Sequence, residues 1–244
     1  MPDDAPAAAP SAGDRFAFDA VADRLRRALA PPNAASPGTA LPGHDAHLTM
    51  APSSRLDRAL LSVEGKTGRE AAVLVLVHPD RHGAACVVLT ARPDTMRDHA
   101  GQVAFPGGRR EPGETLVETA LREAHEEIGL NRDDAALAGA MTPLYIPPTR
   151  FRCHPFVALA PSVPDLVPEP GEVTALLRVP LRTLFAPEAL QVGAWTVNGQ
   201  ASARVPYYRV DAPGGAPGGA PGGGYRVWGA TAMMLAELRA LCTR

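Results

Sequence analysis

The feature that most constrains the fold of this chain is a capped amphipathic helix near its middle, over residues 115–129. Thr115 and Glu118, three residues apart, form the capping-box pattern of a helix start. Gly129 stands where a left-handed residue ends a helix. Apolar residues recur between the caps at steps of three and four, namely Val117, Ala120, Leu121, Ala124 and Ile128. This pattern predicts a helix with one buried stripe.

Three glutamates lie off that stripe. Their spacing is expected to bring Glu123, Glu126 and Glu127 to a single face of the helix. Three carboxylates on one face repel each other unless a cation is present, and carboxylate oxygens are the ligands that Mg²⁺ prefers. Because Mg²⁺ is commonly shared with substrate phosphates, the pattern predicts a site for phosphoryl chemistry. The alternative is a solvated charged face without a metal.

A loop rich in glycine and proline leads into the helix. Residues 105–108 read Phe-Pro-Gly-Gly, and Pro112-Gly113 follows shortly before the helix start. Such a loop lets backbone N–H groups and the helix N-terminus approach an anion.

Together, the loop and the helix resemble the box of the Nudix hydrolases. The match consists of Gly108, five residues, Glu114, seven residues, and then Arg-Glu-Ala-His-Glu-Glu-Ile-Gly-Leu over residues 122–130. All seven fixed letters of that box are in place. Ala124 is the one soft position, since the pattern prefers a larger aliphatic residue there. The resemblance implies an α/β/α Nudix sandwich with a mixed sheet, in which the loop and helix of the box form the metal site.

The resemblance also implies roles for individual residues toward Mg²⁺ or Mn²⁺. Glu123 and Glu127 are the expected metal ligands, and Glu126 is expected to be a third ligand or the base that orients water. Arg122 would fix a glutamate through a bidentate pair. Glu172, outside the box, is a further candidate for the general base, and the alternative for it is an exposed glutamate at the start of a strand.

A second stretch is similar to an additional signature found in the coenzyme A pyrophosphatase branch of the family. Val-Leu-Thr-Ala-Arg over residues 88–92 is followed at the spacing of that signature by Arg97, Gly101 and the Phe-Pro-Gly-Gly of residues 105–108. Val88 replaces the usual Leu, and Pro93 stands where Ser or Ala is usual. With weaker matches downstream, the resemblance covers about residues 53–240.

This branch implies a substrate and its contacts. The expected substrate is coenzyme A or acyl-coenzyme A, cleaved at the diphosphate to adenosine 3′,5′-bisphosphate and 4′-phosphopantetheine or its acyl form. The residues expected to bind it are Arg92, Arg97, Gly107 and Gly108. Arginine is suited to phosphate oxygens because its planar fork donates two parallel hydrogen bonds. The alternative for both arginines is an exposed surface position.

Two other functions stay open at this stage. One is a different Nudix specificity, for ADP-ribose, a dinucleotide or an oxidised nucleotide. The other is a catalytically silent Nudix fold that serves as a binding module, and the intact set of three carboxylates argues against it.

Composition narrows the partners and the compartment. The 244 residues carry a net charge of -2, which gives no basic field for a nucleic acid polymer. No apolar run is long enough for a membrane span. The cysteines Cys86, Cys153 and Cys242 show neither disulfide nor metal-ligand spacing, which favours reduced thiols in the cytoplasm. A small molecule is therefore the expected partner, and a homodimer stays open.

Along the chain we expect four regions. Residues 1–13 read as a disordered tail, residues 14–52 as an N-terminal helix and linker extension, and residues 53–244 as the Nudix domain with a flexible Gly/Pro hairpin insert at 211–224. The linker contains His44 and His47, a weak metal signal. Alternating or aliphatic runs predict strands at 71–77, 85–91, 137–146, 155–160, 172–179, 205–210 and 225–228, and a last helix follows residue 228.

Overall fold

The computed structural model describes residues 14–31, 40–53, 56–93, 102–197, 200–211 and 224–243, with only the backbone described at 195–197 and 200–203. The expected tail, most of the Gly/Pro insert, Arg97 and Gly101 lie outside these ranges.

The elements follow each other along the chain as helices and strands that alternate irregularly. They are α1 (Phe18–Leu29), α2 (Gly43–Leu48), α3 (Arg58–Leu61), β1 (Arg69–Pro79), β2 (Ala85–Ala91), β3 (Val103–Ala104), β4 (Gly107–Arg109), α4 (Leu116–Ile128), β5 (Ala136–Ala140), β6 (Leu144–Ile146), β7 (Phe151–Leu159), β8 (Ala175–Pro180), α5 (Leu181–Leu184), β9 (Leu190–Val197), β10 (Gln200–Val210), β11 (Tyr225–Trp228) and α6 (Gly229–Thr243).

The central sheet is mixed. Its main path is β3-β2-β1-β7-β5, while β4 pairs with β1, β6 with β7 and β8 with β2. Strands β1 and β7 run parallel and their partners run antiparallel. Strands β1 and β2, both predicted, form a hairpin, and its turn is held by Asp80, which accepts hydrogen bonds from the N–H groups of His82 and Ala84. Strands β9, β10 and β11 form a separate antiparallel sheet.

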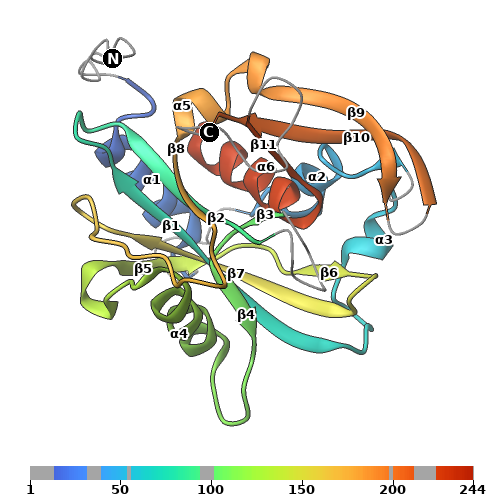
Figure 1. The fold of residues 1–244 in the computed structure, drawn as a ribbon, viewed down its shortest axis with the longest axis horizontal. Coiled ribbons are helices and arrows are strands. Elements are labelled where there is room, and N and C mark those ends of the chain that lie inside the picture. The colour runs from blue at the N-terminus through green and yellow to red at the C-terminus, as the bar shows by residue number, and fades with distance from the viewer. Residues whose placement is uncertain are drawn as a thin grey trace.

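Side chains that alternate along β1 feed two cores on opposite faces of the central sheet. Ala72, Leu74 and Leu76 belong to the core under α4, whereas Val75 and Val77 belong to the larger core under α1 and α6. Figure 1 shows α4 and α6 on opposite sides of the sheet. The predicted α/β/α sandwich with a mixed sheet is confirmed.

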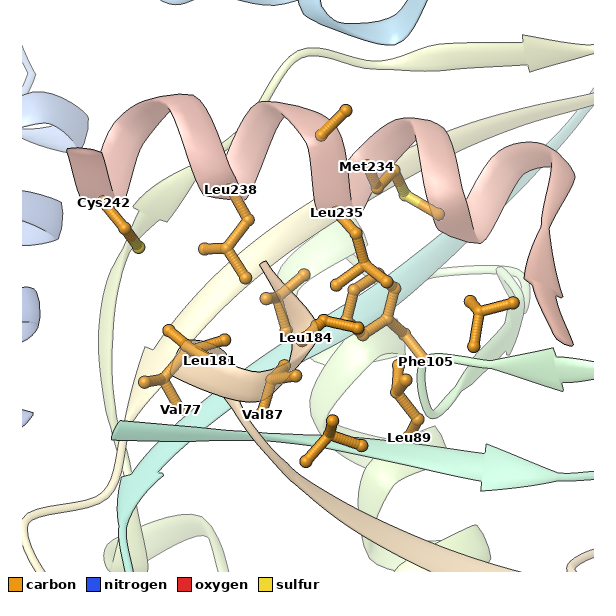
Figure 2. Close-up of a cluster of buried hydrophobic side chains, with 14 of the residues drawn as sticks. Val77, Val87, Leu89, Phe105, Leu181, Leu184, Met234, Leu235, Leu238 and Cys242 are labelled. Carbon is orange, nitrogen blue, oxygen red and sulfur yellow. The ribbon is translucent and has the colours of Figure 1, made fainter. Parts of the chain in front are cut away.

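The predicted last helix, α6, is buried on all sides over much of its length. Every residue from Thr231 to Leu238 is buried. Leu235 and Leu238 of α6 belong to the same core as Val77 and Val87 of the central sheet, and Figure 2 shows Leu181 and Leu184 of α5 among them. Helices α1 and α2 and strands β10 and β11 also contact α6.

The segment expected to be a linker contains a helix that is docked into the domain. Helix α2 lies within it, and the His47 side chain is completely buried, with Nε2 2.9 Å from Glu237 Oε2 on α6. Thr142 donates its hydroxyl to the same carboxylate at 2.7 Å. Burial alone would raise the pKa of Glu237, but the hydrogen bonds from His47 and Thr142 outweigh it and hold the pKa below its ordinary value. The linker prediction was wrong here because a buried polar contact carried no periodic signal.

Other boundaries also differ from the expected ones. The strand predicted over 137–146 is split into β5 and β6, because the Thr142 N–H is used by Glu237 at 3.2 Å and Pro143 has no N–H to give. The strand expected from Glu172 begins at Ala175. Strand β9 was not predicted. In the described part of the chain, no helix is long and apolar enough to cross a membrane.

Candidate active site

The central helix α4 is built as its sequence predicted. The Thr115 hydroxyl accepts from the Glu118 N–H at 3.2 Å, and the Glu118 carboxylate accepts from the Thr115 N–H at 2.8 Å, which completes the capping box. Gly129 ends the helix with φ of 67°, and its N–H donates to the carbonyl of His125. Ala120, Ala124 and Ile128 are fully buried against the sheet, so the helix is fixed to it along one stripe.

The three glutamates of α4 face three different environments. The Glu126 side chain is 53% exposed and that of Glu123 is 17% exposed, but that of Glu127 is only 4% exposed. The prediction that all three lie off the buried stripe was therefore wrong for Glu127. It follows Ala124 by three residues and turns with it toward the sheet. In the described ranges, no three His, Cys, Asp or Glu side chains are gathered closely enough to hold a metal ion.

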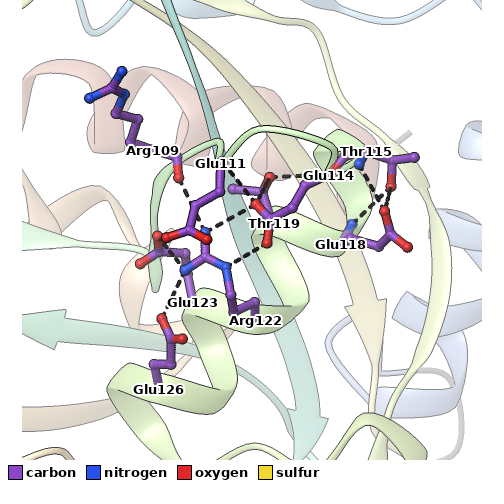
Figure 3. A network of polar contacts seen from close by, with 9 residues as sticks. All are labelled: Arg109, Glu111, Glu114, Thr115, Glu118, Thr119, Arg122, Glu123 and Glu126. Carbon is purple, nitrogen blue, oxygen red and sulfur yellow. Dashed lines mark hydrogen bonds and ion pairs between the residues drawn. The ribbon is translucent and has the colours of Figure 1, made fainter.

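Arg122 links the carboxylates that line the exposed side of the helix (Figure 3). Its Nε and Nη2 bind Glu114 Oε1 and Oε2 at 2.6 and 3.2 Å, which is the two-pronged geometry expected of an arginine and a glutamate. Its Nη1 lies 2.9 Å from Glu123 Oε1 and 2.8 Å from Glu126 Oε2. Arg122 therefore ties the loop before the helix to both glutamates.

Glu114 anchors that loop. Besides Arg122, it accepts hydrogen bonds from the Thr119 hydroxyl at 2.9 Å and from the Glu111 N–H at 3.0 Å. The hydrogen bond from Arg122 is the main reason that the pKa of Glu114 falls to about 2. The carboxylate is thus ionised at neutral pH.

Glu127 is held from two sides. Its Oε1 lies 3.0 Å from Nη2 of Arg92, and its Oε2 accepts from the N–H of Gly107 at 3.1 Å. Burial raises the pKa of Glu127 to about 7, although Arg92 and Gly107 oppose that shift. Burial likewise raises the pKa of Glu123, with Arg122 opposing it.

The two glycines of the loop are required by close contacts. A Cβ at Gly107 would lie 2.4 Å from the carbonyl oxygen of Ala72 on β1. A Cβ at Gly108 would lie 2.4 Å from Oε1 of Glu123, so the absent side chain leaves room for that carboxylate. Both glycines thus have internal roles, and their contact with substrate stays a prediction.

The loop that carries Glu172 reaches the same region. It is tied to the C-terminal end of α4, because Val167 and Glu169 donate their N–H groups to the carbonyls of Ile128 and Glu127 at 3.0 and 2.9 Å. The negative charge of Glu172 helps to raise the pKa values of both Glu123 and Glu127, which places it within electrostatic reach of them.

His154 on β7 pairs with a residue of β1. Its Nε2 lies 2.7 Å from Oε2 of Glu70, and Arg152 binds the other oxygen of that carboxylate. The pairing joins neighbouring strands β1 and β7, and only the three-dimensional register could have revealed it.

The oxygen donors at this site match the chemistry of a hard divalent cation, and the three side chains would have to draw closer together to share one ion. The donor set is three carboxylates within about one turn of α4, and the carboxylate of Glu123 lies in the space that Gly108 leaves open. Burial raises the pKa values of Glu123 and Glu127, and the neighbouring arginines and the Gly107 N–H do not fully offset that effect. A bound Mg²⁺ or Mn²⁺ would supply the missing compensation.

Comparison with known proteins decides the family. A family model described as the NUDIX domain matches residues 68–198, which is more than half of the chain. The chain belongs to the Nudix hydrolase family.

Its relatives include proteins of assigned and unassigned activity. A peroxisomal coenzyme A diphosphatase, ndx-8 of Caenorhabditis elegans, is 35% identical over 128 residues, which are 52% of this chain and 55% of that protein. The uncharacterized Nudix hydrolase NudL of Yersinia enterocolitica is 41% identical over 157 residues, or 62% of this chain and 71% of NudL. The match therefore spans little more than half the length of the worm protein. The crystal structure of the Nudix hydrolase RenU from M. smegmatis covers 51% of this chain and 80% of its own at 28% identity, with a TM-score of 0.40.

Proposed function

We propose that this Nudix hydrolase cleaves the diphosphate of coenzyme A or acyl-coenzyme A. Water would attack one phosphorus of the diphosphate, and the products would be adenosine 3′,5′-bisphosphate and 4′-phosphopantetheine or its acyl form. The observation that carries the proposal is the contact between Arg92 and Glu127, 3.0 Å apart. Arg92 belongs to the coenzyme A signature and Glu127 to the Nudix box, so the fold brings the two motifs to one point.

The proposed roles at the centre follow from exposure and contacts. Glu123, Glu126 and Glu127 would hold Mg²⁺ or Mn²⁺, which when bound would stabilise negative charge on the diphosphate oxygens. Arg122 orients Glu123 and Glu126 through one guanidinium nitrogen. Since Glu126 has the most exposed of the three carboxylates, it is the one placed to orient the attacking water or take its proton.

Recognition of the substrate would depend on cationic donors ahead of the box. Coenzyme A differs from ADP-ribose by a 3′-phosphate and the pantetheine arm, so its site needs additional positive charge. Arg92 lies at the end of β2 beside the glutamates and would bind the diphosphate. Arg97, outside the described residues, is proposed for the 3′-phosphate.

The test is product analysis by mass spectrometry with coenzyme A, 3′-dephospho-coenzyme A and ADP-ribose side by side, each with Mg²⁺ and with Mn²⁺. We expect the highest kcat/KM with coenzyme A and the two products named above. Faster cleavage of ADP-ribose than of coenzyme A would overturn the proposal.

A variant of Arg97 tests recognition of the 3′-phosphate separately. Loss of one charge-assisted hydrogen bond costs roughly 10- to 150-fold, so Arg97→Ala should lose that much kcat/KM on coenzyme A and much less on the 3′-dephospho form. Equal losses of kcat/KM on both substrates would show that Arg97 does not bind the 3′-phosphate.

A further inference from the structure

Each oxygen of the Glu127 carboxylate already has a partner within the protein. Arg92 contacts one oxygen at 3.0 Å and the Gly107 N–H contacts the other at 3.1 Å. With only 4% of its side chain exposed, Glu127 cannot turn out to solvent without breaking both contacts. Arg92 therefore contacts an oxygen of Glu127 that would also be a ligand of the cation.

Arg92 and a cation cannot both keep their best positions at Glu127. The two positive charges would lie within a few ångströms of each other in a partly buried site, where Coulomb repulsion is strong. The N–H of Gly107 cannot move away from Glu127, because it belongs to the backbone of β4 and is fixed against Ala72. The partner that would have to give way is therefore the arginine side chain, which is 24% exposed.

The backbone of Arg92 is anchored at the end of β2. Its N–H donates to the carbonyl of Gln102 at 3.0 Å, just after the last residue of β2. A guanidinium released from Glu127 thus stays within a side-chain length of the carboxylates, where a bound diphosphate would lie.

We propose that Arg92 is a positioning residue that couples metal binding to substrate binding. It holds the Glu127 carboxylate in the cation-free enzyme, yields that oxygen to the divalent cation, and then binds the substrate diphosphate. By linkage, the factor by which the cation tightens diphosphate binding equals the factor by which diphosphate tightens cation binding. The second half of this inference rests on the proposed function, whereas competition for Glu127 does not.

The first experiment uses no substrate. Mn²⁺ is titrated into the full-length protein at pH 8.5, followed by calorimetry and by the electron paramagnetic resonance signal of free Mn²⁺. Wild type is compared with Arg92→Ala and with Arg92→Gln, which keeps a polar side chain at the carboxylate if the smaller residue compromises folding. Removing the competing charge-assisted hydrogen bond should tighten Mn²⁺ binding about tenfold, the low end of what such bonds contribute.

The matched control is Arg109→Gln. Arg109 lies next to the same loop and its loss removes the same charge, but its side chain points away from the glutamates (Figure 3). The contact that Arg109 makes with Arg122 uses its backbone carbonyl, which the variant retains. A gain in Mn²⁺ affinity at Arg92 no larger than that at Arg109 would show a general charge effect and overturn competition at Glu127.

The second experiment measures the coupling with α,β-methylene-ADP, a diphosphate that cannot be hydrolysed at the bridging position. In the wild type, saturating Mn²⁺ should raise the affinity for this probe, and most of that increase should be lost in both Arg92 variants. An unchanged coupling factor would overturn the release of Arg92 to the diphosphate. Failure of the substrate proposal is distinguishable, because a preference for ADP-ribose over coenzyme A would leave both titrations as expected. Absence of Mn²⁺ binding in every variant would overturn both.

Discussion

Replacement of Gly108 by alanine is expected to disable the site without disturbing the fold. The added Cβ would lie 2.4 Å from Cδ and Oε1 of Glu123 and 2.5 Å from its Oε2. These atoms are the far end of a flexible side chain, so the carboxylate moves and the backbone stays. Gly108 has no left-handed φ that would itself strain an alanine.

The magnitude follows from the distance. Ordinary van der Waals contact begins at about 3.4 Å, so the carboxylate must retreat by about 1 Å, and a misplacement of that size costs roughly 100-fold in rate, or about 2.7 kcal/mol. We expect kcat/KM for the diphosphate substrate to fall about 100-fold. The melting temperature should stay within about 4 °C of wild type, because a change of 1 kcal/mol shifts a domain of this size by about 2–4 °C.

The adjacent glycine provides the contrast. In Gly107→Ala, the Cβ would meet the Ala72 carbonyl oxygen at 2.4 Å and the Val73 Cα at 2.6 Å, both on the backbone of β1. Strand β1 is central and cannot move cheaply, so this variant should lose about 3 kcal/mol or more and melt at least about 6 °C lower. The measurements are thermal denaturation by circular dichroism and steady-state kinetics. If Gly108→Ala keeps more than half of the wild-type kcat/KM, or melts as low as Gly107→Ala, the reasoning is refuted.

Three further predictions concern titrating and charged groups. Glu123→Gln and Glu127→Gln should each lower turnover with Mg²⁺ by about 100-fold or more, while their circular dichroism spectra stay those of the wild type. A variant that keeps more than half of the wild-type rate would contradict the metal-ligand roles. Because the pKa of Glu127 is raised to about 7, a proton competes with the cation below that pH, and Mn²⁺ affinity should rise about tenfold from pH 6 to pH 8 and then level off. The metal-free protein should lose stability as pH rises from 4.5 toward 7, because the folded state binds the proton more tightly than the unfolded state. A calorimetric profile that is flat over these pH ranges would refute this prediction. The pKa of Glu237 is lowered, so its pair with His47 stabilises the fold above about pH 4.5, and this stabilisation is lost as pH falls through the pKa of the folded state. Glu237→Ala should lower the free energy of unfolding in urea by roughly 3–5 kcal/mol at pH 7, and a decrease below about 1 kcal/mol would show the pair to be dispensable.

Local signals in the sequence were sufficient for the elements that form the site. The caps at Thr115 and Gly129 and the apolar steps between them depend only on neighbouring residues, and the structure confirms the helix that they predicted. The hairpin at Asp80 was predictable for the same reason, since turn chemistry is local. Resemblance to the Nudix box added the sandwich and its mixed sheet, which no periodicity could have established.

Pairings between distant residues could not be predicted. Glu127 has the same residue type as Glu126 and is its neighbour, yet burial beside β4 separates their environments. The partners of Glu127, Arg92 and Gly107, lie 35 and 20 residues away. The docking of the presumed linker depends on a contact between His47 and Glu237, 190 residues apart. Such contacts exist only once the tertiary fold has formed.

The central position of α6 bears on how the protein is made. The Nudix box is translated about 115 residues before the end of α6, which at about 5–20 residues per second corresponds to roughly 6–23 s. During that interval the core that contains Val77, Val87 and Leu89 has α1 but still lacks α6. The nascent chain is therefore exposed to aggregation and to chaperone binding after its catalytic residues have emerged from the ribosome. A polypeptide released early, before residue 229, would carry the complete Nudix box without the helix that closes its core.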